Sequence, residues 1–552
     1  MSAIAPPLAQ TGADRWLLRA CLWLPLAAML LFFGLPMLSI VWRSLMQDQG
    51  GFGLGNYLAL LDTPGVWRAL RNSLWLGAAT TILTLLLGFV LAYGLERTCM
   101  WGKRWVAVSL ALPMLAPSLV LGLGLIFLLG RNGIVGKMLG MQLDVYGFTG
   151  LLLADILYAL PQAVLIIRAA LRHGDARQYD AAEVLGASPW RQFLDITLPH
   201  ARYGLLSAAF VVFTITITDF GNAVVIGGNF PVLATEIYNQ VNGQMKFGLG
   251  SVVGILLLLP AALSIWIEHV ANQRQSRLSG EAVQAPTAQP RTAPDIGFTL
   301  LCGALSACMT AVVATVVVAS FIRLWPYKLS LTLKHYDITL SDGYSPLWTS
   351  VWVSLLAALF GALMLFMLAF GVRKRPGRLA NAAMVLSALP VGVPGLVLGL
   401  AYVFTFNSAS LPWGMLYGTP ILLALCNYYH YHTQGYVAMM TGMRHVPTQL
   451  EDATTVLGGG MARILRDVYW PALRTTLLAV MVFLFMRSMV TLSAVIFLVT
   501  PALSVGAVSV MRLDEAGFTS QAAAFSTCIM ALVGGLSLAL HGLRGRSPSI
   551  PV

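Results

Sequence analysis

Apolar runs long enough to cross a lipid bilayer recur along the whole chain and restrict its possible folds more than any other feature. A transmembrane helix needs about 20 predominantly apolar residues, and hydropathy picks out about twelve such runs among the 552 residues. The runs cover residues 20–43, 72–95, 104–129, 148–170, 201–226, 247–268, 297–322, 348–372, 379–407, 418–440, 474–500 and 516–543. Because 58% of the residues are hydrophobic and only 10% are charged, the composition excludes an ordinary soluble domain. The sequence therefore predicts an all-α integral membrane protein with about twelve transmembrane helices.

The positive charges are distributed unevenly between the loops on the two sides of this predicted bundle. If the N-terminus is inside, the loops on its side carry roughly twice as many Lys and Arg residues as the opposite loops. Loops rich in Lys and Arg remain in the cytoplasm, so both termini are predicted to be cytoplasmic. The formal net charge of +12 follows from this asymmetry, and we expect no nucleic-acid partner. The six cysteines have neither metal-ligand nor disulfide-framework spacing, so no metal site is expected.

An internal repeat divides the chain. Residues 111–127 recur as 388–404, 277 positions later, and both copies contain Ala-Leu-Pro, a second proline and Leu-Val-Leu-Gly-Leu. Further along, Asp155 corresponds to Asn427 at an offset of 272. The paired prolines are expected to interrupt their helices, which a membrane protein tolerates where other protein covers the break or where the break lines a cavity.

The repeat predicts two parallel six-helix halves, residues 1–270 and 294–552. Residues 271–293 between them are rich in Ala, Gln, Pro, Ser and Arg, which is the composition of a flexible linker, and they are expected to lie in the cytoplasm. Halves with the same orientation imply a pseudo-two-fold axis along the membrane normal and a substrate path between them.

Two polar loops, residues 171–199 (the first loop) and 441–471 (the second loop), share one pattern. The first loop contains Asp180, Ala181, Gly186 and Pro199, and the second contains Asp452, Ala453, Gly458 and Pro471 at the same spacing. We interpret each loop as a short helix, a turn and a second helix. The Asp is expected to cap the first helix or lie in its first turn, and the Ala to allow close helix contact. The Gly is expected to adopt a positive φ and the Pro to begin the next span.

The same loops contain apolar side chains suited to a groove on a partner protein, namely Trp190, Phe193, Met461 and Ile464. Amphipathic interfacial helices without a partner are the alternative interpretation. Two matched copies on the predicted cytoplasmic side favour a partner.

This pattern resembles the EAA loop through which the permease subunits of ABC importers dock on their ATPase subunits. Two copies in one chain resemble a fused pair of type I ABC-importer permease subunits. Asp replaces the family's Glu in both loops, and Thr454 replaces the second Ala of the second loop. The resemblance implies a multi-pass protein of the bacterial inner membrane. Its implied partners are two copies of an ATPase subunit, an extracytoplasmic substrate-binding protein and membrane lipid.

No nucleotide-binding loop accompanies the pattern. The nearest match, Gly133–Met138, lacks the spacing and the Ser or Thr of a Walker motif. We therefore expect that the chain is not an enzyme and has no cofactor of its own. By the resemblance, ATP and Mg²⁺ bind to the partner ATPase.

Ionisable residues within membrane spans are functional candidates by default. Asp219 and Arg487 lie in the fifth and eleventh apolar runs, which correspond in the repeat, and Asp155, Asn222 and Asn427 accompany them. These five residues are predicted to line the translocation path, where Asp219 and Arg487 would meet opposite charges on a substrate. A structural ion pair between Asp219 and Arg487 is the alternative.

Several stretches bear on the substrate. Residues 218–228, 493–499 and 513–517 are similar to stretches of 2-aminoethylphosphonate permeases, in a branch that also serves ferric iron, thiamine and polyamine-like substrates. The resemblance implies an organophosphonate importer, since an Asp and an Arg suit the ammonium and phosphonate groups of a zwitterion. A ferric-iron, thiamine or polyamine importer is the alternative within the family. A secondary transporter with the same number of helices is the alternative outside it, and it would not account for the matched loops.

Overall fold

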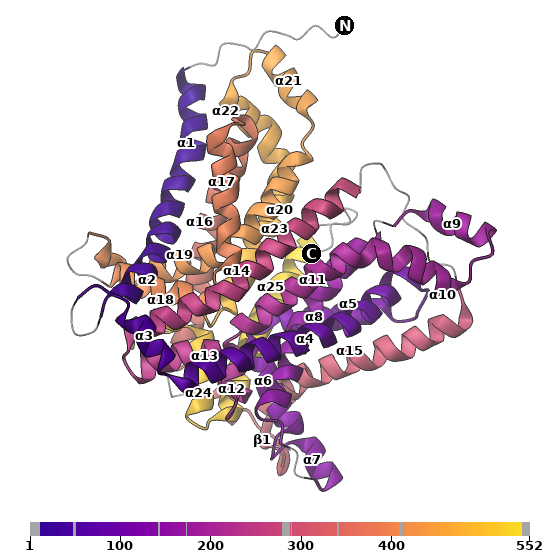
Figure 1. Cartoon of the computed structure of the whole chain (residues 1–552), viewed down its shortest axis with the longest axis vertical. Helices are drawn as coiled ribbons and strands as arrows, with labels where there is room; N and C mark the ends of the chain where they lie inside the picture. Colours follow the sequence, from indigo (N-terminus) through magenta and orange to yellow (C-terminus); the bar gives the residue numbers. More distant parts are fainter. Residues whose placement is uncertain are drawn as a thin grey trace. The chain divides into compact units, whose positions relative to one another are not determined.

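The computed structural model is almost entirely helical (Figure 1). It describes residues 12–47, 51–141, 144–172, 174–278, 288, 290–338, 342–407 and 412–543. The chain divides into two compact units. Unit 1 comprises Met1–Trp42, Ser345–Val505 and Leu532–Val552, and unit 2 comprises Arg43–Tyr344 and Gly506–Ala531.

The helices are assigned to the units as follows. Unit 1 contains α1 (Gly12–Met29), α16 (Ser345–Lys374), α17 (Arg378–Ala388), α18 (Gly395–Phe406), α19 (Pro420–His430), α20 (His432–Arg444), α21 (Thr448–Val456), α22 (Met461–Ile464) and α23 (Trp470–Met489). Unit 2 contains α3 (Gly55–Leu61), α4 (Pro64–Arg97), α5 (Lys103–Ala111), α6 (Ser118–Leu129), α7 (Ile134–Leu139), α8 (Phe148–Arg172), α9 (Ala176–Val184), α10 (Pro189–Gln192), α11 (Leu198–Thr218), α12 (Gly221–Ile226), α13 (Leu233–Tyr238), α14 (Phe247–Leu278), α15 (Thr292–Ser320) and α24 (Gly506–Glu515). Two of the boundaries between the units fall within helices, namely α2 (Leu35–Leu45) and α25 (Thr519–Leu543).

Short 3₁₀ and π-helical turns connect or extend these helices. They are Leu30–Gly34, Leu112–Leu115, Phe193–Thr197, Asn239–Gly243, Lys334–Tyr336, Leu389–Gly392, Pro412–Leu416 and Leu465–Tyr469. A small antiparallel hairpin in unit 2, β1 (Ile322–Leu324) and β2 (Lys328–Leu331), was not predicted from the sequence. It follows the span α15 and leaves the all-α class of the membrane region unchanged.

The described residues contain ten helices that are long and apolar enough to cross a membrane. An eleventh span is obtained if Arg378–Gly392 and Gly395–Phe406, which are bent by 108° relative to each other, are counted together. The predicted class, an all-α integral membrane protein, is confirmed. The predicted span 418–440 is instead divided at Tyr431 into α19 and α20, which have 11 and 13 residues.

The paired prolines interrupt their helices as predicted. Pro117 (φ −54°, ψ 145°) precedes α6, and Pro394 (φ −56°, ψ 141°) precedes α18. Because both prolines are extended, the helix before each of them cannot continue into the next one. The repeat in the sequence is therefore also a repeat in backbone conformation.

Each unit takes its first span from the other half of the chain. α1, from the predicted first half, packs in unit 1 against α16, whereas α15, which opens the second half, packs in unit 2 against α5 and α6. Two glycines at equivalent repeat positions allow the close approach. A Cβ on Gly371 of α16 would lie 3.2 Å from the backbone of Cys21 in α1, and a Cβ on Gly94 of α4 would lie 2.9 Å from Sγ of Cys302 in α15. Hydropathy could not predict this exchange, because it does not specify which helices pack together.

The junction between the halves was predicted as a linker over residues 271–293. In the structure α14 continues as far as Leu278, so the helix extends into the first part of this segment. Residues 279–287 and 289 lie outside the described residues. The division of the chain into halves at this segment stays a prediction.

Candidate functional site

The first helix of each loop begins before the repeated Asp. α9 begins directly after Asp175, whose carboxylate accepts a hydrogen bond from the N–H of Arg177 at 3.0 Å. α21 begins directly after Pro447. Asp180 and Asp452 are each the fifth residue of their helix, so the predicted capping role is wrong. The start of each helix is fixed earlier, by a different side chain in the first loop and by a proline in the second.

The turn after each first helix has the predicted conformation. Gly186 and Gly458 have φ values of +74° and +77°. Backbone hydrogen bonds of the Schellman type close both turns, such as the 2.9 Å bond from the N–H of Ala187 to the carbonyl of Ala182. Since glycine adopts this φ at lower steric cost than residues with a side chain, the turn conformation explains why both loops have glycine here.

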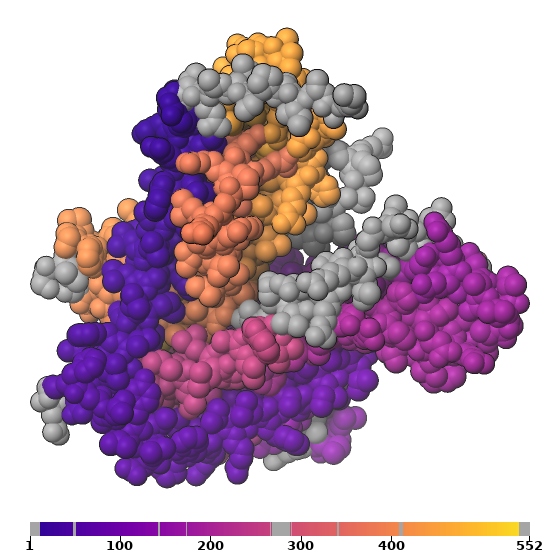
Figure 2. Space-filling view, turned by 45° about the horizontal axis from the view of Figure 1, so that its top comes forward, coloured from indigo at the N-terminus to yellow at the C-terminus, as the bar shows by residue number. Residues whose placement is uncertain are grey.

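The exposed side chains of the two loops form matched surfaces. They are Asp180, Ala181, Val184 and Leu185 in the first loop, and Asp452, Ala453, Val456 and Leu457 in the second. Val184 and Leu185 are 88% and 85% exposed, and their counterparts in the second loop are 80% and 79% exposed. In Figure 2 the purple first loop lies at one end of unit 2. Paired aliphatic tips of this kind suit insertion into a partner. Sequence reasoning missed these tips, although Val-Leu-Gly occurs in both loops.

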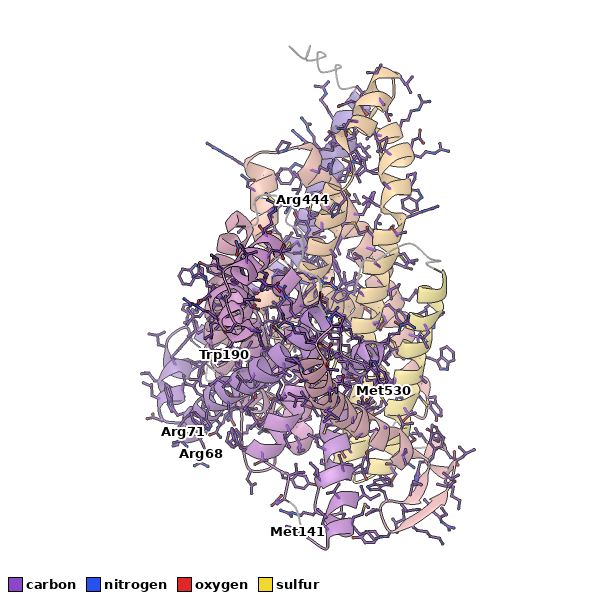
Figure 3. The ribbon with its side chains drawn as sticks, turned by 90° about the vertical axis from the view of Figure 1, so that its right-hand side faces the viewer. Arg68, Arg71, Met141, Trp190, Arg444 and Met530 are labelled. Atoms are coloured by element: carbon purple, nitrogen blue, oxygen red, sulfur yellow. The ribbon has the colours of Figure 1, made fainter. Side chains whose placement is uncertain are left out.

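The other apolar side chains predicted to contact a partner differ in their exposure. Trp190 is 68% exposed (Figure 3) and stacks on the partly buried Phe193, with ring centroids 5.4 Å apart. Met461 is partly buried. Ile464 is only 5% exposed, so its predicted role as a contact residue is wrong. Its side chain is buried within unit 1 and is therefore not available to a partner.

The prolines that end the pattern have their predicted place. Pro199 and Pro471 are the second residues of α11 and α23. A π-helical turn joins each of these helices to the short helix before it, which gives continuous helical segments over Pro189–Thr218 and Met461–Met489. Each loop is therefore continuous in backbone structure with a candidate membrane span.

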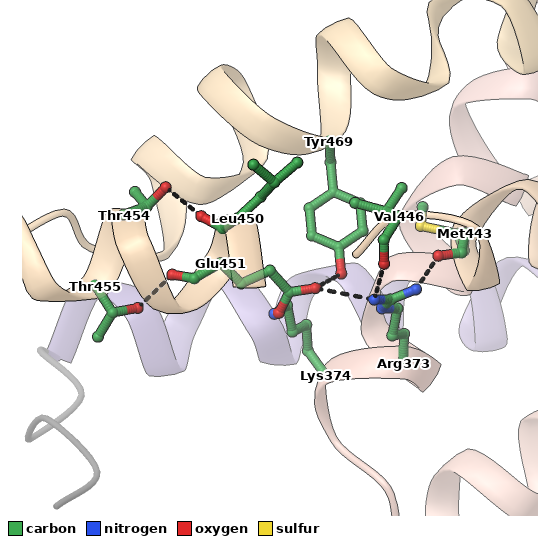
Figure 4. A network of polar contacts seen from close by, with 9 residues as sticks. All are labelled: Arg373, Lys374, Met443, Val446, Leu450, Glu451, Thr454, Thr455 and Tyr469. Carbon is green, nitrogen blue, oxygen red and sulfur yellow. Dashed lines mark hydrogen bonds and ion pairs between the residues drawn. The ribbon is translucent and has the colours of Figure 1, made fainter. Parts of the chain in front are cut away.

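Glu451 anchors the second loop at its base (Figure 4). Its carboxylate forms ion pairs with Arg373, at 3.1 Å, and with Lys374, both at the end of α16, and it accepts a hydrogen bond from the hydroxyl of Tyr469. Arg373 also donates a 2.7 Å hydrogen bond to the carbonyl of Val446. These charged side chains are mostly buried. Removing one of them would leave an opposite charge buried without an ion-pair partner, which destabilises a protein strongly.

A corresponding contact anchors the first loop in unit 2. Arg97, at the end of α4, donates a 3.2 Å hydrogen bond to the hydroxyl of Tyr179, and its guanidinium lies 4.8 Å from the centre of that ring. The Tyr179 hydroxyl is 2.9 Å from Oγ1 of Thr197. In the repeat, Arg97 corresponds to Lys374, Tyr179 to Glu451 and Thr197 to Tyr469. The position of the anchor is thus repeated while its chemistry differs, with a neutral phenol where the second loop has a carboxylate.

Three of the predicted path residues meet in unit 2. Asn222 donates its Nδ2 to Oδ1 of Asp155 at 3.0 Å, and its backbone N–H donates to Oδ2 of Asp219 at 2.9 Å. Asp155 and Asn222 are buried, with exposures of 2% and 0%. The predicted span 201–226 is divided at Asp219, since Asp219 and Phe220 separate the end of α11 from the start of α12. The Asp219 carboxylate therefore accepts an N–H group of the first turn of α12.

The other two predicted path residues lie in unit 1. The guanidinium of Arg487, on α23, lies 5.0 Å from the centre of the Tyr431 ring, a cation–π geometry. Asn427 donates a 2.7 Å hydrogen bond to the hydroxyl of Ser488. Because Asp219 and Arg487 belong to different units, their predicted proximity stays a prediction.

No group of three or more His, Cys, Asp or Glu side chains suited to a metal ion occurs among the described residues. His430 and His432 are separated by the helix break at Tyr431, and Nδ1 of His432 lies 2.9 Å from the Tyr428 hydroxyl. The His432 ring therefore has a hydrogen-bond partner within its own segment.

Acidic groups outside the candidate spans gather where α13 and α24 lie in unit 2. Burial, reinforced by the neighbouring negative charge of Glu515, raises the pKa of Asp514 to about 6. Burial also raises the pKa of the Tyr238 phenol, and the charge of Glu515 adds to this rise. Near pH 6, Asp514 therefore carries a proton in a larger fraction of molecules than an exposed aspartate does.

Comparison with known proteins places this geometry in context. Residues 84–277 match the family described as binding-protein-dependent transport system inner membrane component. The chain is 27% identical over 522 residues to the ferric transport system permease protein FbpB of Actinobacillus pleuropneumoniae, covering 90% of this chain and 74% of that protein. It is 34% identical over 183 residues to the molybdenum transport system permease protein ModB of Azotobacter vinelandii, covering 32% of this chain and 81% of that protein.

A solved structure is also similar, that of a bacterial ABC transporter involved in the import of the acidic polysaccharide alginate. Its chain has a TM-score of 0.39 and 20% sequence identity, and the similarity covers 48% of this chain and 97% of that chain.

The family match falls on the first repeat, from the second apolar run to the end of α14, and it includes the first loop. The similarity to FbpB extends over both repeats, so the fused arrangement is shared with that permease. These relatives are transport permeases, and the ten apolar helices agree with a multi-pass protein. The chain therefore belongs to the family of binding-protein-dependent transport system inner membrane components.

Proposed function

We propose that the chain is the permease subunit of an ATP-driven importer and that each loop docks one ATPase subunit. The observation that supports this most strongly is the pair of matched loop tips. Each tip presents an exposed Val-Leu pair before a glycine turn, on a helix that is anchored at its base. Each loop also continues into a membrane helix. A secondary transporter would have no need for two such surfaces.

ATP and Mg²⁺ bind, in this proposal, to the partner ATPase. The Gly133–Met138 segment does not have the sequence of a phosphate-binding loop, and no other stretch approaches one. A substrate-binding protein delivers the substrate from outside, in line with the description of the family. The chain itself provides the path and responds to the ATPase subunits.

Each loop would pass ATPase movement into the membrane by two routes. One route is the base contact, between Tyr179 and Arg97 in unit 2 and between Glu451 and Lys374 in unit 1. The other is the continuous helix from each loop into α11 or α23, whose far ends lie at Asp219 and Arg487. Loop displacement would therefore act on the candidate path residues of both units.

For the substrate, we propose a small zwitterionic organophosphonate such as 2-aminoethylphosphonate. Arg487 supports an anionic group, since a guanidinium in a membrane helix marks a functional candidate and binds phosphonate oxygens in a planar arrangement. Asp219, together with Asp155 and Asn222, supports a cationic group on the same substrate. Ferric iron is the second candidate, and it is favoured by the similarity to the ferric transport permease over 90% of this chain.

Reconstitution tests the function and the substrate together. The chain is placed in proteoliposomes with its proposed ATPase and substrate-binding protein, and uptake of 2-aminoethylphosphonate and of ferric iron is measured with and without ATP. We expect ATP-dependent uptake of 2-aminoethylphosphonate and two ATPase subunits per chain. ATP-dependent uptake of ferric iron without uptake of 2-aminoethylphosphonate would refute the proposed substrate and favour iron. Uptake driven by a proton gradient without the ATPase would refute the importer itself.

Membrane orientation gives a further prediction. Both termini and both loops are proposed to face the cytoplasm, and the β1–β2 hairpin to face outside, because the Lys and Arg residues are enriched in the loops on the N-terminal side. In a cysteine-free background, Ser330→Cys on β2 should react with a membrane-impermeant thiol reagent in intact cells. Gln178→Cys on α9, which is also exposed in the structure, should react only after permeabilisation. The reverse labelling pattern would contradict the orientation.

A further inference from the structure

The first turn of α1 contacts the second loop. Oδ1 of Asp14 accepts a 2.7 Å hydrogen bond from the backbone N–H of Met461, the first residue of α22, which lies 447 positions away in the sequence. A Cβ added to Gly460 would lie 3.2 Å from the same oxygen, so glycine leaves room for the carboxylate. Both segments belong to unit 1, and α1 and α22 lie side by side there (Figure 1). α22 is therefore capped by a side chain from the other end of the chain.

The first loop supplies its own cap. Oγ of Ser188 accepts a 3.3 Å hydrogen bond from the N–H of Arg191 at the start of α10. Ser188 corresponds in the repeat to Gly460, which has no side chain to cap α22. An uncapped helix start leaves backbone N–H groups without partners. The second loop thus lacks this local cap. Asp14 instead binds the N–H of Met461, whose counterpart in the first loop is Pro189 and has no N–H to bind.

The equivalent carboxylate of the second half binds a segment outside the two loops. Asp295, in the first turn of α15, accepts a 2.8 Å hydrogen bond from the N–H of Cys99 in the turn after α4. Asp14 and Cys21 of α1 correspond to Asp295 and Cys302 of α15 at a single offset. Both first spans therefore use an equivalent carboxylate to bind a backbone N–H group, but only Asp14 binds a segment that we assign to ATPase docking.

We propose that Asp14 is a positioning residue that ties the first span to the second loop, so that ATP-driven movement of this loop passes directly to α1. The inference rests on the proposed function. The second loop is bound on both sides of its Gly458 turn, by Glu451 before the turn and by Asp14 after it. The first loop is also bound on both sides of its Gly186 turn, by the Tyr179 anchor before it and by packing of the Phe193 ring on Phe89 and Tyr93 after it, but these contacts are with its own half of the chain. The two loops are therefore mechanically different, and α1 moves with the second one.

The contact itself is tested by hydrogen exchange in the assembled transporter. Asp14→Ala should accelerate exchange of the Met461 amide about fivefold, as expected for the loss of a helix cap. Asp14→Asn should leave the exchange rate within about twofold of the wild type, because Asn caps helices as well as Asp does. Asp295→Ala, the matched control on α15, should leave the Met461 amide unchanged. An unchanged rate in Asp14→Ala would refute the contact.

The coupling role is tested by the number of substrate molecules transported per ATP hydrolysed. Asp14→Ala should lower this ratio by about fivefold or more, the scale of a typical coupling between sites, whereas Asp14→Asn and Asp295→Ala should retain it. Gly460→Ser in the Asp14→Ala background restores a local cap like Ser188 without restoring the tie to α1. A serine at position 460 would accept the N–H of Arg463, as Ser188 accepts that of Arg191. The double variant should therefore show slow exchange of the Arg463 amide without recovering the transport ratio.

Recovery of the transport ratio in this double variant would reduce Asp14 to a simple helix cap and overturn the proposal. A normal ratio in Asp14→Ala would overturn it as well. If the wild-type chain with its ATPase and binding protein transports nothing in the presence of ATP, the proposed function fails, whereas the exchange measurement still reports on the contact.

Discussion

Replacing both Gly186 and Gly458 with valine should abolish ATP-dependent uptake while the chain still inserts into the membrane and co-purifies with its ATPase subunits. The two glycines have φ values of +74° and +77°. A side chain in this left-handed region costs about 1–2 kcal/mol per residue, and β-branching adds to the cost. The native turn would then be depopulated in both loops, so that the exposed Val-Leu tips no longer face the ATPase at a fixed angle. Uptake and ATP hydrolysis in proteoliposomes measure the effect.

Asparagine at both positions is the matched control. It is larger than glycine but tolerates the left-handed conformation because its side chain bonds locally to the backbone. An added Cβ at either glycine would meet no other atom within 4 Å, so size alone should not matter. The double Asn variant should therefore keep most of the uptake. An equal loss in the Asn and Val variants, or normal uptake in the Val variant, would contradict the assignment of these turns to coupling.

Arg487→Leu should reduce uptake about 100-fold or more, since removing one member of a desolvated charge pair costs roughly 3 kcal/mol. We propose that its guanidinium, placed over the Tyr431 ring, meets the anionic group of the substrate. Assembly with the ATPase should be unaffected, because the second loop lies at the opposite end of the helical segment that carries Arg487, and the first loop lies on another segment. Arg474→Leu, an exposed arginine near the start of α23, is the matched control and should transport normally.

The alternative is that Arg487 and Asp219 form a structural pair. Asp219→Asn separates the two roles, because a path residue that meets an ammonium group should affect a zwitterion more than a simple anion. If the two charges only neutralise each other, each single variant should express poorly and the double variant Arg487→Leu with Asp219→Asn should recover uptake. Uptake and expression level across this double-mutant cycle decide the question, and recovery in the double variant would refute the path assignment.

The parts of the molecule that the sequence predicts well are those determined by local constraints. Apolar length predicts a membrane helix because lipid leaves no other way to satisfy the backbone. The backbone restrictions of glycine and proline likewise predict the turns at Gly186 and Gly458 and the helix break before Pro394, since few other conformations are open to these residues.

The features that the sequence did not predict depend on contacts between distant segments. The preference for Asp at helix starts predicts that Asp180 caps the first helix of its loop, but Asp175 lies at the start of that helix and caps it. Ile464 was assigned to a partner, whereas α22 turns it into unit 1. The contact of Glu451 with Lys374, and that of Asp14 with Met461, join residues with no local relationship. The repeat offset could have related the Glu451 anchor to Tyr179, but only after one of the two was known.

The exchange of first spans between the two units bears on how such a transporter can be made. Each half of the chain lacks one helix that its own core packs against, and that helix is carried by the other half, as in a domain-swapped dimer. Two separate polypeptides would have to find each other in the membrane before either could finish folding. Joining them in one chain makes this step intramolecular and independent of concentration. A fused gene thus guarantees equal amounts of two halves that have diverged, as Tyr179 and Glu451 have, and prevents either half from pairing with a copy of itself.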